Sequence, residues 1–310
     1  LVETIQKSIQ FNKIPNAYIF TGIRGVGKTT TARIVAKMLN CTAFDNSNKP
    51  DLLNCEQAKA ITEDRHPDVI EIDAASNTSV ENAREIIENV KYNPVLGKYK
   101  VYIIDEVHML SKSAFNALLK TLEEPPPHSK FIFATTEISK VPITILSRCQ
   151  RFDLRRIDKK VLSLFLETIA NKENILIEKE ALNLIVKSSD GSVRDALSIL
   201  DQANVFKLEE TIKTEEIINM LGYSKLSDLY DLSKNILENN LTDLISKLET
   251  MYQRGSETSK ILEDLMNIIN WSCKLKINSN LIKDEFLTED DKNFASYVTQ
   301  YDHGKLNIFW

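Results

Sequence analysis

The sequence predicts an α/β fold, in which a parallel β-sheet with helices on both faces is followed by a mostly helical part. Two observations divide the chain: all eight prolines lie between Pro15 and Pro142, and only four of the eight glycines come after Pro142. Because both residues disfavour helix interiors, the later part is expected to be helical. A third observation concerns the earlier part, where short runs of Val, Ile and Phe alternate with segments of helical periodicity. Such runs are typical of parallel strands that are buried on both faces.

The expected elements follow in order along the chain. The predicted strands are the short apolar runs Ala17–Thr21, Asp68–Ile72, Lys100–Ile104 and Lys130–Thr135. Helical periodicity in the same part predicts helices over Thr29–Leu39, Val80–Val90 and Lys112–Leu122. The later helices are expected over Lys159–Glu173, Lys179–Ser188, Val193–Phe206, Leu226–Leu237, Leu241–Tyr252 and Thr258–Trp271. Gly222 stands where a helix is expected to end.

Composition and charge limit the classes of protein to consider. The chain has 310 residues, of which 43% are hydrophobic and 27% charged, so we expect a folded protein of two or three domains. No apolar run approaches the roughly 18 residues of a membrane span, and four cysteines fit a reducing, cytoplasmic location. The net charge of −5 argues against a surface coated with positive charge, but it allows a local basic face. Since the first residue is Leu1 rather than Met, we expect the chain to be a fragment.

A glycine-rich phosphate loop is the strongest chemical signal. The segment matches G-x-x-x-x-G-K-[ST] between an expected strand and an expected helix, the context in which this pattern indicates nucleotide binding. Glycines let successive N–H groups approach phosphate oxygens, and the following helix adds the positive end of its dipole. Lys28 is expected to contact phosphates and Thr29 to hold Mg²⁺. The predicted loop residues are Gly22, Ile23, Arg24, Gly25, Val26, Gly27, Lys28, Thr29 and Thr30.

Polar residues also follow two other expected strands. Asp105 and Glu106 end the run VYII, where Asp105 is expected to hold Mg²⁺ and Glu106 to act as a general base on water. Thr135 and Thr136 end another strand, where a hydroxyl could sense the terminal phosphate or position water. By itself each pair could equally be a strand running into a solvated turn.

Two arginines complete the set of candidates. Arg148 could stabilise transition-state charge on a nucleotide held by a neighbouring subunit, and Arg194 could reach the nucleotide from the start of a later helix. Arg148 also opens a basic cluster, which from residue type alone is more commonly a solvated face. That cluster consists of Arg148, Arg151, Arg155, Arg156, Lys159 and Lys160.

Several long segments together resemble one known family. From about Ile5 to Gly222, and more weakly beyond, the chain resembles the gamma/tau subunits of bacterial DNA polymerase III, which are ATPases of the sliding-clamp loader. The segments that carry the resemblance are TGIRGVGKTTTARIVAK, DVIEIDAASN, KYKVYIIDEVHMLSKSAFNALLKTLEEPPPH, FATTE, ILSRCQRFDLRRI and GSVRDALSILDQA.

The resemblance implies a fold, a set of roles and a set of partners. It implies an AAA+ nucleotide-binding domain over residues 1–157, which lacks the family's N-terminal segment, a helical lid over 158–222 and an all-helical collar over 223–310. It makes residues 22–30 Walker A, Asp105 and Glu106 Walker B, and Thr135 or Thr136 sensor 1. Arg148 becomes an arginine finger that acts in trans, and Arg194 becomes sensor 2. The cofactors implied are ATP and Mg²⁺.

The partners implied by the resemblance are those of a clamp loader in chromosome replication. They are the delta and delta-prime subunits, other gamma/tau copies, the sliding clamp (beta) and primer–template DNA, with the polymerase core and helicase added only where a longer tau-type tail exists. Such subunits are grouped with the polymerase holoenzyme. The sequence shows no palm-type pair of metal-binding carboxylates, so we expect ATP hydrolysis and no polymerase chemistry in this chain.

The zinc module of related proteins is expected to be lost here. Relatives carry four cysteines after the Walker A helix, and a structural zinc site needs four ligands. Cys41 and Cys55 remain, but Leu52 and Ala58 stand at the other two positions, and neither side chain can bind a metal. We therefore expect zinc to be absent, with the two cysteines acting as small buried hydrophobes.

Two other functions are consistent with parts of this pattern. A non-hydrolysing structural subunit of the same ring, like delta-prime, typically lacks a working Walker A lysine, but Lys28, Thr29, Asp105 and Glu106 are all present here. A different AAA+ motor, such as a branch-migration helicase, would share the phosphate loop. The segments SRC and NALLKTLEEPP argue against that motor.

Overall fold

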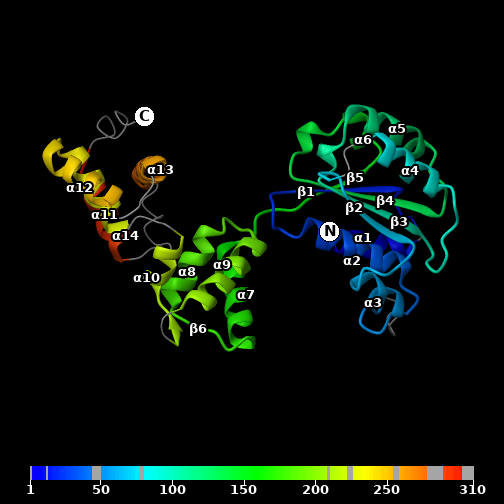
Figure 1. Cartoon of the computed structure of the whole chain (residues 1–310), viewed down its shortest axis with the longest axis horizontal. Helices are drawn as coiled ribbons and strands as arrows, with labels where there is room; N and C mark the ends of the chain where they lie inside the picture. The colour runs from blue at the N-terminus through cyan, green and yellow to red at the C-terminus, as the bar shows by residue number, and fades with distance from the viewer. Residues whose placement is uncertain are drawn as a thin grey trace. The chain divides into compact units, whose positions relative to one another are not determined.

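The computed structural model describes residues 2–11, 13–43, 50–76, 80–207, 210–221, 226–253, 258–277 and 289–301. The chain forms two compact units, which are described separately. The first comprises Leu1–Ile157 together with Gly191–Asp195, and the second comprises Asp158–Asp190 and Ala196–Trp310. Figure 1 labels the helices and strands of both.

The first unit is built on a five-stranded parallel sheet (Figure 1). The strands are β1 (Ala17–Thr21), β2 (Val69–Asp73), β3 (Lys100–Asp105), β4 (Ser129–Thr135) and β5 (Gln150–Asp153). Their order is β2-β3-β4-β1-β5, and each neighbouring pair is parallel. Because parallel strands end at the same edge of a sheet, the residues after β1, β3 and β4 come close together.

Helices cover both faces of this sheet. Strand side chains alternate between two apolar clusters, as in β1, where Tyr18 and Phe20 join one cluster and Ala17 and Ile19 join the other. The first cluster includes residues of α1 (Val2–Gln10) and α2 (Lys28–Asn40). The second includes residues of α4 (Val80–Val90), α5 (Lys112–Glu123) and α6 (Ile143–Leu146). The remaining described helices of this unit are α3 (Glu56–Thr62), η1 (Val107–Met109) and η2 (Ile138–Lys140).

The second unit is mostly helical. Its elements are α7 (Lys159–Lys172), β6 (Leu176–Ile177), α8 (Lys179–Ser188), α9 (Val193–Phe206), β7 (Thr211–Ile212), α10 (Thr214–Met220), α11 (Leu226–Leu237), α12 (Leu241–Gln253), α13 (Thr258–Ile277) and α14 (Glu289–Val298). The first three residues of α9 belong to the first unit. A single apolar cluster joins α11 to α14, in which the rings of Tyr230 and Phe294 stack 4.2 Å apart.

The predicted fold class is confirmed, and the structure adds elements that sequence patterns did not indicate. The predicted helices Val80–Val90, Lys179–Ser188 and Val193–Phe206 have the predicted bounds. The structure adds α1, α3, α10, α14 and the strands β5, β6 and β7. Sequence patterns do not indicate β5 because three of the four residues in its sequence, QRFD, are polar, which an edge strand with partly exposed side chains tolerates. Gly222 and the predicted boundary after it lie outside the described residues.

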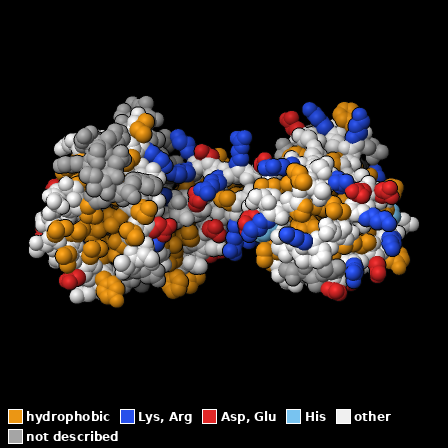
Figure 2. Space-filling view, turned by 90° about the horizontal axis from the view of Figure 1, so that it is seen from above, with side chains coloured by type: hydrophobic (Ala, Val, Ile, Leu, Met, Phe, Trp, Pro, Cys, Tyr) orange, Lys and Arg blue, Asp and Glu red, His pale blue; other side chains and the backbone are white. Residues whose placement is uncertain are grey.

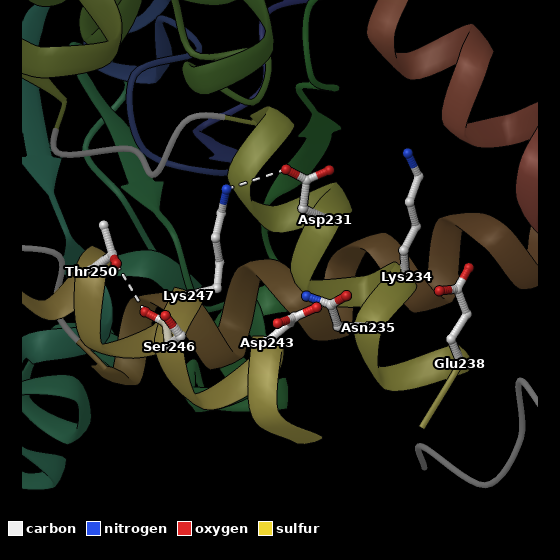
Figure 3. A pocket seen from close by; sticks show the side chains of 8 residues that line it. All are labelled: Asp231, Lys234, Asn235, Glu238, Asp243, Ser246, Lys247 and Thr250. Carbon is white, nitrogen blue, oxygen red and sulfur yellow. Dashed lines mark hydrogen bonds and ion pairs between the residues drawn. The ribbon is translucent and has the colours of Figure 1, made fainter. Parts of the chain in front are cut away.

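Two surface features of the second unit are visible in the figures. A polar groove of about 370 Å³ lies along α11 and α12, where Lys247 contacts Asp231 at 3.2 Å (Figure 3). Figure 2 shows hydrophobic side chains gathered on one face of the bundle. Exposed large hydrophobic residues of α12 and α13 are Leu241, Ile245, Tyr252, Leu262, Met266 and Ile277.

None of the helices in the described residues is long and apolar enough to cross a membrane.

Candidate nucleotide site

The predicted phosphate loop lies between β1 and α2, with Lys28 as the first residue of the helix. Gly27 precedes the helix with a φ of 92°, and Gly25 has a φ of 78°, both in the left-handed region that favours glycine. A Cβ on Gly25 would lie 1.9 Å from Ser192 Oγ, so only glycine fits there. Gly27 has no side chain to cap the first N–H groups of α2, which leaves them available to an anion.

Lys28 is buried beneath this loop, with 5% of its side chain exposed. Its Nζ donates a hydrogen bond to the carbonyl oxygen of Ile23 at 3.1 Å and lies 3.9 Å from Glu106 Oε1. Burial lowers the pKa of Lys28, Glu106 and Asp105 act in the opposite direction, and Arg194 lowers it further. A phosphate at this position would supply the negative charge that the buried ammonium lacks.

Thr29 connects the loop to the end of β3. Its hydroxyl donates a hydrogen bond to Asp105 Oδ2 at 2.5 Å, and the other carboxylate oxygen of Asp105 accepts the N–H of Glu106 at 2.9 Å. Hydroxyl and carboxylate oxygens are hard ligands of the kind that Mg²⁺ prefers. Thr30 and Arg24 of the predicted loop are exposed.

Glu106 is held toward the end of β4. Its Oε2 accepts both the N–H and the hydroxyl of Thr136, each at 3.0 Å. The backbone of Glu106 has a φ of 46°, an uncommon conformation that is costly for a non-glycine residue and that clusters at functional sites. Thr135, in contrast, is fully buried and its Oγ1 lies 3.0 Å from His108 Nδ1. The structure thus places Thr136, rather than Thr135, in contact with Glu106.

Arg194 lies beside the same loop. The N–H groups of Val193 and Arg194, at the start of α9, donate hydrogen bonds to the carbonyl oxygen of Gly25 at 3.1 and 3.3 Å. Gly191, with a φ of 79°, forms the turn before this helix. The structure therefore brings Arg194 together with the loop residues, Asp105, Glu106 and Thr136.

Arg148 is the one predicted residue that lies elsewhere. It precedes β5, which pairs with β1 from Tyr18–Gln150 to Thr21–Asp153. Gln150 therefore lies about 10 Å along the strand from the carboxyl end of β1, where the phosphate loop begins. Arg148 donates hydrogen bonds to Glu123 Oε1 at 2.5 Å and to the carbonyl oxygen of Thr144 at 2.6 Å.

Cys41 and Cys55 are buried in a small apolar cluster with Ala58, against which Leu52 packs. Burial raises the pKa of Cys41 to about 11. Cys55 is also buried, which acts to raise its pKa, but the N–H groups of Ala58, Thr42 and Ala43 and the Cys41 thiol stabilise its thiolate, so its pKa falls to about 7. No three His, Cys, Asp or Glu side chains are grouped to hold a metal among the residues that the structure describes. The expectation about zinc remains a prediction.

Three residues near the site were not singled out by the sequence patterns. His108 and Glu137 flank Glu106 and Thr135, and Ser192 packs against Gly25. His108 stands in the motif DEVH, but a single histidine in a sequence gives no indication of which side chains it will face. Ser192 is adjacent to the predicted Arg194, although its contact with the loop arises only from the fold.

Comparison with protein families gives matches along the whole chain. The family model described as DNA polymerase III, delta subunit matches residues 1–158. The model described as DNA polymerase III clamp loader subunit, ATPase lid domain matches residues 162–206. The model described as DNA polymerase III subunits gamma and tau domain III matches residues 212–310.

Similar proteins come from several bacteria. The chain is 44% identical over 269 residues to DNA polymerase III subunit tau of Bacillus subtilis, which covers 86% of this chain and 47% of that protein. It is 40% identical to subunit tau of Escherichia coli, covering 87% and 42%. It is 38% identical over 308 residues to subunit gamma of Buchnera aphidicola subsp. Schizaphis graminum, covering 99% and 84%. The match therefore spans less than half the length of each of the two tau relatives.

Among solved structures, the fold is similar to that of Thermotoga maritima RuvB, a Holliday junction branch migration motor. The TM-score is 0.52 at 17% sequence identity, covering 85% of each chain. At this identity the likeness shows the AAA+ fold that the sequence predicted, and nothing about activity.

Proposed function

Since this chain belongs to the gamma/tau family of bacterial DNA polymerase III subunits, we propose that it is the subunit that binds and hydrolyses ATP in a sliding-clamp loader. In this role it would open the clamp and place it on primer–template DNA during chromosome replication. The contact between Thr29 and Asp105 carries the proposal most directly, because it joins the two motifs on which ATP hydrolysis depends.

The phosphate loop and its lysine would bind the nucleotide. The uncapped N–H groups at the start of α2 and the buried ammonium of Lys28 belong to the same loop–helix junction, and both suit the phosphates of ATP. Thr29 and Asp105 would hold Mg²⁺, which neutralises charge on the phosphates when it is bound.

Glu106 would orient and deprotonate the attacking water. In this structure Thr136 occupies its Oε2 with two hydrogen bonds, whereas Oε1 faces Lys28 at 3.9 Å. Thr136 is therefore our choice for sensor 1, because a hydroxyl that contacts the catalytic carboxylate can report on its position.

The two arginines would act on different nucleotides. Arg194 lies beside Gly25 and lowers the pKa of Lys28, which supports a role at the chain's own nucleotide. Arg148 lies before the amino end of β5, whereas the phosphate loop follows the carboxyl end of β1, and Arg148 would act on a nucleotide held by a neighbouring subunit.

The partners follow from the family and remain part of the proposal. We assign residues 1–157 to the nucleotide-binding domain, 158–222 to the lid and 223–310 to the collar. The exposed hydrophobic residues of α12 and α13 are suited to packing against other subunits, which would be the delta and delta-prime subunits or further gamma/tau copies. Binding of the clamp, and of the polymerase core and helicase through a longer tail, belongs to the same assignment.

One observation favours a second function. Residues 1–158 match the family model described for delta subunits, so a structural, non-hydrolysing role in the same ring must be tested. Against it stand Lys28, Thr29, Asp105 and Glu106, all present and in mutual contact or close approach.

Reconstitution separates these functions. The chain is mixed with delta, delta-prime and the clamp, and ATP hydrolysis is measured with and without primed DNA. The proposed function predicts co-purification of the subunits and faster hydrolysis when clamp and primed DNA are both present. A ring that assembles but whose hydrolysis does not depend on this chain would indicate the structural role, and hydrolysis stimulated by branched DNA without the clamp would indicate a branch-migration motor.

A further inference from the structure

His108 lies in the short helix η1, immediately after the two acidic residues that end β3. Only 6% of its side chain is exposed. Its Nδ1 lies 3.0 Å from Thr135 Oγ1 and 3.4 Å from Glu106 Oε2, and its Nε2 lies 3.5 Å from Glu137 Oε1. The imidazole thus faces the proposed general base on one side and the end of β4 on the other.

Thr135 suits either tautomer of His108, because its hydroxyl can donate to Nδ1 or accept from it, so the nearby carboxylates are the groups that discriminate between the two nitrogens. Glu106 and Glu137 are carboxylates, which only accept hydrogen bonds, and Thr135 Oγ1 already accepts the N–H of Glu137 at 3.0 Å. A bare Nδ1 would point its lone pair at Glu106 Oε2, whereas a protonated Nδ1 is attracted to that oxygen and can donate to Thr135. The contact of Nε2 with Glu137 is longer, at 3.5 Å, and Lys140 already pairs with Glu137 at 2.8 Å. The contact at Nδ1 is therefore the important one.

Thr136 and His108 both lie close to the same carboxylate oxygen of Glu106. Thr136 donates two hydrogen bonds to Glu106 Oε2, and His108 Nδ1 approaches that oxygen from the neighbouring helix. Glu106 needs this support because its backbone is in the left-handed conformation just after the end of β3, so the strand no longer sets the direction of its side chain. A carboxylate that is 29% exposed would otherwise sample several rotamers.

We propose that His108 is a positioning residue for ATP hydrolysis, whose Nδ1–H aligns the Glu106 carboxylate and the Thr135 hydroxyl at the ends of β3 and β4. The inference rests on the proposed function, in which Glu106 acts on water. His108 does not contact the nucleotide in this account, so its loss changes the rate of the chemical step and leaves ATP binding unchanged.

Two substitutions separate the nitrogens of the imidazole. His108→Asn places an amide N–H near the position of Nδ1, and His108→Gln places one near the position of Nε2. Each variant, with His108→Ala and Glu106→Gln, is assembled into the ring with clamp and primed DNA. The measurements are kcat and KM for ATP, nucleotide binding by the chain itself, and the melting temperature.

The expected result is that His108→Gln and His108→Ala lower kcat by about 10- to 100-fold with KM nearly unchanged, because misalignment of a catalytic group costs rate rather than affinity. His108→Asn should recover most of that loss. Wild-type kcat in His108→Ala, or equal losses in the Asn and Gln variants, would overturn the inference even where Glu106→Gln abolishes hydrolysis. Normal hydrolysis by Glu106→Gln would overturn the role of Glu106, and the inference with it.

Discussion

Replacing Arg148 with alanine should leave the folded chain almost unaffected and yet block hydrolysis in the ring. Arg148 pairs with Glu123 at 2.5 Å, but the two side chains are 32% and 50% exposed. Ion pairs this exposed contribute about 0.2–1 kcal/mol to the free energy of unfolding. The melting temperature and nucleotide binding of the isolated chain should therefore change little.

The effect on the assembled ring should be far larger. Arginines that stabilise transition-state charge on a neighbour's nucleotide contribute about 10³–10⁵ in rate, equal to about 4–7 kcal/mol of activation free energy. The contrast between a small loss of stability and a large loss of rate distinguishes a catalytic arginine from a residue that stabilises the fold.

The assay has two steps and a matched control. Nucleotide is titrated into each isolated variant, and ATP hydrolysis is then measured in the ring with clamp and primed DNA. Arg65→Ala serves as the control, because Arg65 is an exposed arginine that pairs with Glu63 away from the site. If Arg148→Ala hydrolyses ATP as fast as the Arg65→Ala ring, the assignment in trans is wrong and the basic cluster is a solvated face.

Three further predictions concern other parts of the first unit. Arg194→Ala should weaken nucleotide binding several-fold in the isolated chain, because it removes a positive charge that is close enough to Lys28 to lower the pKa of that lysine; titration showing unchanged affinity would contradict this. Elemental analysis should find little or no zinc in the purified protein, because Cys41 and Cys55 supply only half of a tetrahedral site; about one zinc per chain would show that other ligands complete it. The buried Asp68 carboxylate accepts three N–H groups of residues 95–97 at 2.7 Å each, so Asp68→Ala should lower the free energy of unfolding by about 3–5 kcal/mol in urea. Burial acts to raise the pKa of Asp68, but these hydrogen bonds lower it overall. The contribution of Asp68 to the free energy of unfolding is therefore complete above the ordinary Asp pKa, and it is lost as the pH falls through the lower pKa of the folded state. If the urea midpoint of the wild-type protein varied no more with acid pH than that of Asp68→Ala, this prediction would be wrong.

Local patterns predicted those parts of the site that depend on a single segment. The phosphate loop is recognisable because its glycines and Lys28 are adjacent in sequence, and Asp105 is recognisable because four apolar residues precede it. Thr29 and Asp105 were each expected to hold Mg²⁺, and the structure places them in hydrogen-bond contact because the ends of parallel strands lie on the same side of the sheet.

Features that depend on how segments meet could not be predicted in this way. The sequence gives no reason to choose between Thr135 and Thr136, because both are threonines at the end of the same strand. Side chains at successive positions of an extended chain point in opposite directions, so only Thr136 reaches Glu106. Three of the four side chains of β5 are polar, and one of them, Arg151, belongs to the predicted basic cluster, although the backbone of β5 completes the sheet. His108 contacts Thr135 of β4, a strand that begins more than 20 residues later in the chain, so its surroundings depend on the fold.

The central claim, that this chain uses ATP to load a clamp, is tested most directly by Lys28→Ala in the reconstituted ring. Lys28 is a buried cation whose pKa is lowered by burial, so its removal should leave the melting temperature unchanged or slightly higher. With clamp and primed DNA present, the variant ring should neither hydrolyse ATP at this subunit nor load clamps, whereas the wild-type ring should do both. Clamp loading at the wild-type rate by a folded Lys28→Ala ring would contradict the account.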